Sequence, residues 1–446
     1  MSTQTSLFDR FKVWLRSSVM LRIIGIFILV ILLTIPTSEI RSLIYERENL
    51  RDQAINNISE SWGGEQTLSG PVLSVPYEEV YKDDGGEIKT RLEYAHFLPE
   101  QLSVTGNLVP ELRSRSIYEA VLYIAQTNWD GTFAMPDPEF LNLSVEDLHW
   151  SDAFISVGIT DVRGIDKQTD LNWKGEHLPF SPGIPVVGLL RSGISTPVAL
   201  DPTNQEEIPF SIKLDLKGSN GIYVSPLGKT TNVSINAPWA DPKFTGSFLP
   251  KEREVGEAFS ASWEVLHLNR NFPQQWTGLQ RMGFAQDFNF GVELLIQVDH
   301  YRKSERSIKY ALLLICLTFL VFFFVEIMNR QRIHPISYLL VGLAITIFYA
   351  LLLSLSEHIP FGWAFLIGAI AVISLITVYA LSILKSQKLT LVTTGLLVLM
   401  FGFNYSLLQL EDYALLIGVL GLFVVLTAVM LVARNIDWYA YAREEE

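Results

Sequence analysis

The stretch IIGIFILVILLTI, residues 23–35, is the first of two places where the chain is apolar enough to enter a membrane. A hydrocarbon core of about 30 Å needs roughly 20 mostly apolar residues in each crossing helix. Extended at both ends, the stretch predicts a span over Val19–Ser38, and the last third of the 446-residue chain predicts five more. These later spans are Ile308–Met328, Ser337–Ser356, Pro360–Leu384, Leu389–Gln409 and Tyr413–Ala433. With a mean hydropathy of +0.27, the layout predicts a polytopic membrane protein with a long polar insert after its first span.

The charges of the short loops predict which side each loop faces, because loops rich in Lys and Arg stay in the cytoplasm. One set of loops and ends is basic and carries Arg10, Lys12, Arg16, Arg22, Arg330, Arg332, Lys385, Lys388 and Arg434. The alternate loops hold Glu357 with His358, then Glu411 with Asp412, and neither contains Lys or Arg. We therefore expect both termini in the cytoplasm and residues 40–307 outside it, which is the periplasm in a Gram-negative cell.

The first apolar run is short enough to be a signal peptide instead of an anchor. Its exit reads Pro36-Thr37-Ser38-Glu39, which contains no small-x-small cleavage site. Arg22, just before the run, can reach back to the membrane surface with its long side chain. We favour an uncleaved anchor, and a mature chain that begins near residue 39 would contradict it.

These observations divide the chain into four parts: 1–39 with the first span, 40–307 outside, 308–434 as a five-helix bundle and 435–446 as a cytoplasmic tail. Beyond the first span, apolar residues from Ile40 to Ile58 fall on one helical face, and helix-forming residues continue to Gly63-Gly64. This pattern predicts a stalk helix. It could serve as a lever that transmits motion, but a spacer packed on the domain is the simpler interpretation.

After Gly70 the apolar period changes from 3.6 to 2, which is typical of strands. Residues 73–81 and 88–94 alternate around Asp84-Gly85-Gly86 and predict a β-hairpin. Residues 210–216 alternate before Asn220-Gly221, and this pair predicts a second hairpin with Ile222–Val224. Residues 259–265 form another one-sided strand. Many short alternating strands with Gly and Pro between them predict an antiparallel β-sandwich-like domain.

The sequence contains few signs of chemistry. The net charge of −13 argues against nucleic-acid binding, and the single Cys316 allows no disulfide in the exported domain. There is no phosphate-loop, dinucleotide, zincin or nucleophile-elbow string. The outer histidines, His96, His149, His177 and His267, lack metal-ligand spacing. We therefore assign no catalytic, cofactor-binding or metal-ligating residue. A pair of outer-domain carboxylates at glycosidase spacing stays open as an alternative.

Ionisable side chains inside a membrane are functional candidates by default. Glu326 lies near the end of the second span, where Arg330, Arg332 and His334 follow closely enough to pair with it. Glu357 and His358 mark the end of the third span, and Asn404 and Gln409 lie in the fifth. We interpret these groups as anchors and helix-end partners. Trp363, Tyr413, Trp438 and Tyr439 fit an aromatic belt, and Thr393, Thr394, Gly395 and Gly402 would permit close helix packing.

Several longer strings make the chain similar to a known family. They are Ser61–Pro71 (SWGGEQTLSGP), Phe244–Pro250 (FTGSFLP), Lys309–Leu313 (KYALL), Arg332–Pro335 (RIHP), Tyr338–Leu343 (YLLVGL), Leu353–His358 (LSLSEH) and Arg434–Tyr439 (RNIDWY). Through them the chain resembles, from about Leu21 to Tyr439, the CreD family of bacterial inner-membrane cell envelope integrity proteins. We read Gly63-Gly64 and Gly70-Pro71 as a structural joint, and Pro335 as a residue of the first turn of the third span.

The resemblance implies a role in envelope stress as an output of the Cre two-component system, with altered sensitivity to certain colicins and β-lactams. It supplies no catalytic residue. We therefore expect a non-enzymatic protein that contributes to envelope integrity, with membrane lipids and other envelope proteins or peptidoglycan as partners. Two alternatives are a transporter of small solutes or lipids that uses the bundle near Glu326 and His334, and a periplasmic enzyme that modifies glycan or lipid.

Overall fold

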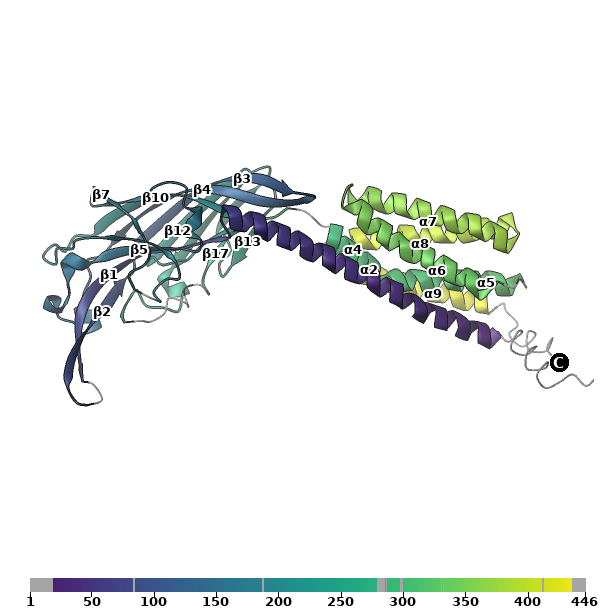
Figure 1. The fold of residues 1–446 in the computed structure, drawn as a ribbon, viewed down its shortest axis with the longest axis horizontal. Coiled ribbons are helices and arrows are strands. Elements are labelled where there is room, and N and C mark those ends of the chain that lie inside the picture. Colours follow the sequence, from purple (N-terminus) through teal and green to yellow (C-terminus); the bar gives the residue numbers. More distant parts are fainter. Residues whose placement is uncertain are drawn as a thin grey trace, which may run out of the picture. The chain divides into compact units, whose positions relative to one another are not determined.

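The computed structural model describes residues 19–82, 85–186, 188–278, 285, 287–296, 300–329, 331, 333–410 and 413–434. The chain forms two compact units (Figure 1). One, the membrane unit, combines Met1–Leu50 with Val298–Glu446, and the other, the β domain, comprises Arg51–Gln297. Helix α2 (Val19–Trp62) has its first part in the membrane unit and its last part in the β domain.

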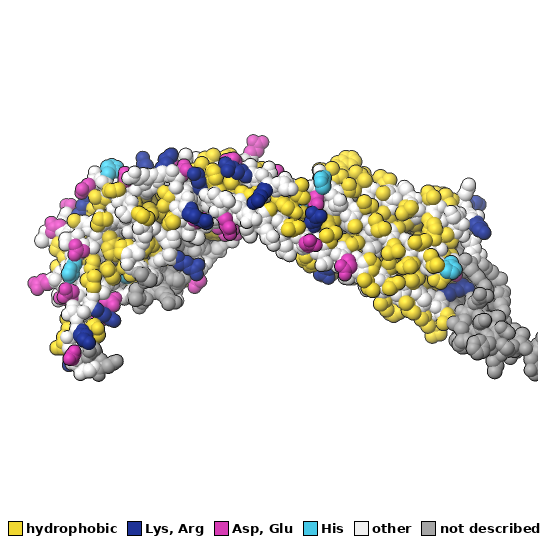
Figure 2. All heavy atoms as spheres, viewed as in Figure 1, with side chains coloured by type: hydrophobic (Ala, Val, Ile, Leu, Met, Phe, Trp, Pro, Cys, Tyr) yellow, Lys and Arg dark blue, Asp and Glu magenta, His cyan; other side chains and the backbone are white. Residues whose placement is uncertain are grey.

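Six helices in the described ranges are long and apolar enough to cross a membrane, which confirms the predicted number and its one-plus-five arrangement. The membrane unit contains α2, α4 (His300–Lys309), α5 (Ala311–Met328), α6 (Pro335–Ser356), α7 (Phe361–Leu384), α8 (Gln387–Gln409) and α9 (Ala414–Ala433). Hydrophobic side chains cover most of the face of these helices seen in Figure 2. Pro335 begins α6, as predicted, because its missing N–H would have no helical partner there.

The first span and the stalk are one continuous helix rather than two elements. Helix α2 passes through Pro36, which cannot donate a backbone hydrogen bond. Nearby hydroxyls bond carbonyls of the preceding turn: Thr37 Oγ1 donates to the Leu33 carbonyl at 2.7 Å, and Ser38 Oγ to the Ile35 carbonyl at 2.7 Å. Such side-chain bonds are a common way for apolar helices to accommodate proline.

Helix α6 is the centre of the bundle. Its Phe348 is fully buried and meets Phe365 of α7 and Phe401 of α8, with ring centroids 5.1 and 4.9 Å apart. Helix α9 lies at the periphery and buries only Ala414 among its residues. The small residues of α8 were expected to permit close packing against other helices. Thr393 is buried, as this expectation requires. Gly395 and Gly402 face open space among the described residues, so the expectation is wrong for these two glycines.

The β domain consists of two sheets. The first, sheet A, has the order β13-β17-β11-β1-β5-β9-β8, with β2 pairing β1 and β16 pairing β2; the second, sheet B, has the order β14-β15-β12-β3-β4-β10-β6-β7. The strands are β1 (Gln66–Lys82), β2 (Ile88–Phe97), β3 (Gln101–Arg115), β4 (Tyr118–Phe133), β5 (Phe154–Ile159), β6 (Asp170–Trp173), β7 (Glu176–Pro179), β8 (Ser181–Pro182), β9 (Gly193–Pro197), β10 (Ile208–Ser219), β11 (Gly221–Val224), β12 (Thr230–Ala237), β13 (Pro242–Gly246), β14 (Glu252–Val255), β15 (Phe259–Leu266), β16 (Gln275–Thr277) and β17 (Phe290–Leu294).

Both sheets contribute to one hydrophobic core, which confirms the predicted layered β architecture. Trp129 and Phe133 of sheet B and Phe290 of sheet A are among its largest fully buried side chains. Most strand pairs are antiparallel, as expected. Among the described strands two pairs are parallel, β1 with β11 and β3 with β12, so the domain is mixed.

The first predicted hairpin is confirmed, since β1 and β2 pair from Leu73↔Phe97 to Lys82↔Ile88; Asp84 of its turn lies outside the described residues. The one-sided strand is also confirmed as β15. The second predicted hairpin is wrong. Strand β10 belongs to sheet B, whereas β11 pairs with β1 and β17 in sheet A. Of the two central residues only Asn220 has a positive φ, of 60°, and a primed hairpin turn of type I′ needs both. Asn220-Gly221 is thus a corner between sheets.

Candidate functional site

The end of α2 is fixed to the β domain by its last residue, Trp62. The indole Nε1 donates to the Tyr123 carbonyl at 3.3 Å. The Arg113 guanidinium and the Lys217 ammonium lie 4.4 and 5.0 Å from the ring centroid. Cations at these distances are attracted by the ring quadrupole. One hydrogen bond and two cation–π contacts of Trp62 therefore attach the end of the helix to the β domain.

Gln66 completes this joint four residues further on. Its side chain is fully buried and donates from Nε2 to the carbonyls of Asp161 (3.0 Å) and Lys217 (2.9 Å), while Oε1 accepts from the Asp161 amide at 3.1 Å. The Asp161 carboxylate accepts from the Gly64 amide, and its bond with Arg163 lowers the pKa of that carboxyl. These contacts lie around Gly63-Gly64, one of the two pairs interpreted as a structural joint. Asp161 and Arg163 also belong to this joint.

The outward face of sheet B is lined by short polar side chains in three cross-strand rows. Strand pairing aligns β15, β12, β3, β4 and β10, so that outward residues stand beside one another. The rows are Glu264–Asn232–Ser103–Asp130–Ser211, Ser262–Ser234–Thr105–Asn128–Lys213 and Ser260–Asn236–Asn107–Gln126–Asp215. We call these fifteen residues the polar face. Most of them carry a hydroxyl or an amide, which can both donate and accept hydrogen bonds.

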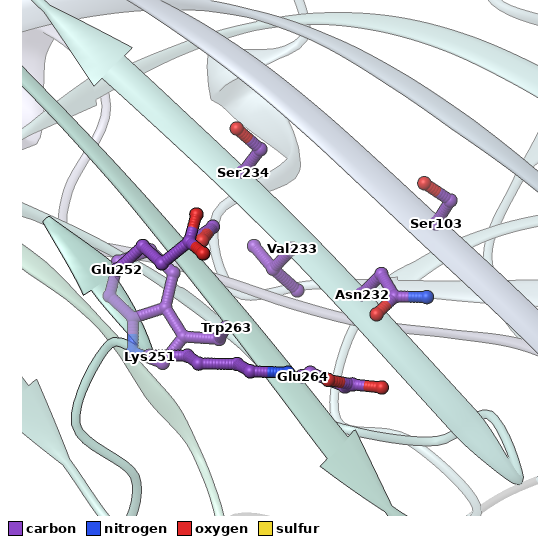
Figure 3. A pocket seen from close by; sticks show the side chains of 9 residues that line it. Ser103, Asn232, Val233, Ser234, Lys251, Glu252, Trp263 and Glu264 are labelled. Carbon is purple, nitrogen blue, oxygen red and sulfur yellow. Dashed lines mark hydrogen bonds and ion pairs between the residues drawn. The ribbon is translucent and has the colours of Figure 1, made fainter.

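One end of the polar face contains an open depression of about 240 Å³, shown in Figure 3. Its walls come from β3, β12 and β15, and Lys251 and Glu252 close one side. Lys251 forms an ion pair with Glu264, which raises the pKa of the Lys251 amine. Trp263 lies beneath and donates to the Phe248 carbonyl at 3.2 Å. The depression can offer hydroxyl, amide and carboxylate groups to a polar ligand.

The histidines of the β domain do not converge on a metal site in the described part of the chain. There, no group of three or more His, Cys, Asp or Glu side chains could hold a metal ion. His96 is buried beside Trp276, and its Nδ1 lies 2.8 Å from the Ser74 hydroxyl. Burial lowers the pKa of His96 to about 4, so its ring is neutral at ordinary pH. It belongs to the core.

In the membrane unit, Glu326 is a buried acid, with 3% of its side chain exposed. Arg22 of α2 approaches it with Nη1 3.2 Å from Oε1, and the Tyr338 hydroxyl of α6 donates to Oε2 at 2.8 Å. Sequence reasoning placed the partners of Glu326 in the following loop. Arg330 and Arg332 lie outside the described residues, and the basic partner in the structure comes instead from the first span.

A cavity of about 440 Å³ adjoins this ion pair. It lies among α2, α5 and α6, and so includes the first span, whereas the transporter alternative invoked only the five-helix bundle. Its lining residues are Leu21, Arg22, Gly25, Ile26, Leu29, Glu326, Ile333, His334, Pro335 and Tyr338. His334 caps α6, because its Nδ1 accepts from the Ile336 amide at 3.3 Å. The result is an apolar wall with a charged end.

Other polar side chains in the described part of the membrane unit form contacts between helices. Glu357 accepts from the Tyr301 hydroxyl at 3.0 Å and faces Arg47 of α2 at 4.0 Å. Tyr45 of α2 donates to Glu305 at 2.8 Å. Helix α2 is thus bonded to the later helices both near its start and near residues 45–47. Asn404 is 4% exposed in the second half of α8 and lies beside the Tyr349 hydroxyl.

The structure defines the class as a six-span membrane protein with a two-sheet β domain inserted after the first span. A family model described as "Inner membrane protein CreD" matches residues 18–439. "Inner membrane protein CreD" of Escherichia coli (strain K12) is 32% identical over 434 residues, which cover 96% of this chain and 95% of that one. The chain therefore belongs to the CreD family of inner membrane proteins, as its sequence motifs predicted.

Two solved structures of one peptidase resemble the chain weakly. An M1 zinc metallopeptidase from Deinococcus radiodurans matches with a TM-score of 0.20 and 9% identity, covering 44% of this chain and 42% of that chain. A point mutant of the same peptidase, bound to a tripeptide substrate, gives the same TM-score, identity and coverage. Likeness at this level carries no argument about fold or activity.

Proposed function

We propose that the protein is a non-enzymatic component of envelope integrity that holds a periplasmic β domain on the inner membrane. Both termini would lie in the cytoplasm, with residues of about 40–307 in the periplasm. In the described loops, Lys385, Lys388 and Arg434 alternate with the acidic Glu357, which supports this orientation. Family membership supports the membrane location.

The β domain would bind a neutral glycan strand of the envelope, such as that of peptidoglycan, on the polar face. The single observation that carries this proposal is the alignment of the three cross-strand rows. A glycan presents hydroxyl and acetamido groups along its length, and each needs donors and acceptors on the protein when water is displaced. The central positions of the rows, from β12 to β4, are mostly uncharged, which suits an uncharged ligand.

A bracing role also needs the helix that enters the β domain to be well anchored in that domain. Helix α2 is uninterrupted from Val19 to Trp62, and Trp62 and Gln66 bond its end into the β domain. An enzyme that uses Glu252 and Glu264 as acid and base has less support, because Lys251 already pairs with Glu264.

Co-sedimentation of the detergent-solubilised full chain with purified peptidoglycan sacculi tests the proposal. The triple change Asn107→Ala, Asn232→Ala and Asn236→Ala removes three exposed amides from the polar face, and we expect it to weaken binding about tenfold, or by about 1.4 kcal/mol. The matched control removes three exposed amides from α2: Gln53→Ala, Asn56→Ala and Asn57→Ala. Equal binding by both triple variants, or no sedimentation of the unchanged protein, would overturn the glycan assignment.

A further inference from the structure

We propose that the cavity among α2, α5 and α6 binds a phospholipid whose headgroup carries both a phosphate and an ammonium group. The cavity combines an apolar wall with a charged end, as an amphiphile requires. The charged end is formed by Arg22, Glu326, Tyr338 and His334, and the apolar wall by Leu21, Gly25, Ile26, Leu29 and Ile333. Its volume of about 440 Å³ lies within the range of small-ligand pockets, roughly 300–1,000 Å³.

The phosphate would contact Arg22 and His334. A guanidinium has five N–H donors, so the contact between Nη1 and Glu326 leaves others for a phosphate oxygen. The Arg22 side chain keeps 26% of its surface exposed, so a ligand can reach it. His334 Nδ1 accepts from the Ile336 amide, and the neutral ring therefore carries its proton on Nε2, where it can donate.

The ammonium group would contact Glu326. A carboxylate has about four lone-pair sites, and Arg22 and Tyr338 use one on each oxygen. The charges of Arg22 and Glu326 cancel before any ligand binds. A zwitterionic headgroup keeps the occupied site neutral, whereas an anionic headgroup would add an uncompensated charge in a low-dielectric region, which is costly. Charge balance thus favours phosphatidylethanolamine over phosphatidylglycerol.

Gly25 provides the means to block the cavity without touching its charges. A Cβ atom built on Gly25 meets nothing within 4 Å, so a larger side chain there can enter the cavity. Gly395 of α8 is a matched control, because its Cβ also meets nothing within 4 Å and it does not line the cavity. Gly25→Leu and Gly395→Leu therefore add the same group to the same kind of helix, inside and outside the site.

The test is native mass spectrometry of the full chain released from nanodiscs that contain equal amounts of phosphatidylethanolamine and phosphatidylglycerol. We expect phosphatidylethanolamine to be retained about tenfold more than phosphatidylglycerol, a difference of about 1.4 kcal/mol. Gly25→Leu should lower the retained phosphatidylethanolamine about tenfold, and Gly395→Leu should leave it unchanged.

A second variant keeps the test valid if Gly25→Leu fails to fold. Arg22→Gln with Glu326→Gln removes both charges together and so leaves no unpaired buried ion. Lipid should still be retained by this double variant, but without preference between the two headgroups. Equal retention of both lipids by the unchanged protein, or equal phosphatidylethanolamine on Gly25→Leu and Gly395→Leu, would overturn the proposal by indicating ordinary surrounding lipid. The glycan-binding proposal is unaffected by either result.

Discussion

Arg22 at the start of α2 and Glu326 near the end of α5 form an ion pair with 3.2 Å between Nη1 and Oε1. One partner belongs to the first span and the other to the second, so the pair joins helices that the whole β domain separates along the chain. Charged groups at membrane depth are stable only when they are paired or solvated. The ion pair therefore holds α2 against α5 and supplies the charged end of the proposed lipid cavity.

Reversing the charges of this pair should show mutual rescue. Arg22→Glu places two acids together and should destabilise the membrane unit by about 3 kcal/mol, the lower end of the range for a broken buried pair, because Arg22 is partly exposed. Glu326→Arg should behave similarly. The double variant restores opposite charges, and we expect most of the apparent Tm in detergent to return. A double variant less stable than both single variants would contradict the pairing.

The Tyr338 hydroxyl should contribute more than an ordinary tyrosine hydrogen bond, because its acceptor is a carboxylate. Tyr338→Phe should cost about 1.5–3 kcal/mol, the usual range for bonds to charged groups. Tyr379→Phe is the control, since the Tyr379 hydroxyl donates to the neutral Ser337 hydroxyl at 3.2 Å and should be worth about 1 kcal/mol. Thermal unfolding of both variants in the same detergent compares them, and equal losses would contradict a stronger hydrogen bond at Tyr338.

The joint at the end of α2 depends on Gln66. Gln66→Leu keeps the approximate side-chain size but leaves the Asp161 and Lys217 carbonyls without this partner. We expect a loss of about 2–3 kcal/mol in the β domain, the cost of unsatisfied buried polar groups. Gln101→Leu on an exposed position of β3 should change stability by less than about 0.5 kcal/mol. Tryptophan fluorescence during urea unfolding measures both, and similar midpoints would mean that Gln66 is not a structural link.

The spans and the layered β architecture were predictable because each depends on local patterns. A helix needs enough apolar residues in succession to cross a bilayer, and a half-buried strand needs alternation. The alternation from Phe210 to Leu216 identified which side chains of β10 face the core. It did not indicate that the next strand, β11, would join the other sheet, because that choice is set by pairing with β1 and β17, which are distant in sequence.

The candidate sites were less predictable, because they also depend on contacts between residues that are distant in sequence. Glu326 was recognised as a candidate, but its partner Arg22 could be identified only once α2 and α5 were adjacent. The nearer arginines in the loop were the natural choice from sequence spacing. The polar face contains ordinary outward residues of several strands, and its three rows exist only through the register of β15, β12, β3 and β4. The joint, in contrast, could be predicted from the sequence, because its Gly-rich string is compositionally unusual.

His96 predicts a specific pH dependence for the β domain. Burial lowers its pKa from 6.5 to about 4, so between these values the unfolded chain binds a proton that the folded chain does not. Stability therefore rises with pH across this window, and acidification from pH 6.5 to pH 4 should cost about 3 kcal/mol, at about 1.4 kcal/mol per pKa unit. His96→Asn offers Ser74 a polar partner that does not titrate, and it should flatten the apparent Tm between pH 4 and 6.5.

His177 provides the control for this experiment, because it is an exposed histidine on β7 of the same domain. His177→Asn should leave the pH dependence as it is in the unchanged protein, because the His177 ring stays exposed to water when the domain folds. Tryptophan fluorescence reports the unfolding of this domain, because Trp129, Trp263 and Trp276 are buried in it. If His96→Asn retained the full acid sensitivity between pH 4 and 6.5, the assignment to His96 would be wrong, because carboxylates with a lowered pKa, such as Asp161, lose their stabilising charge only at lower pH.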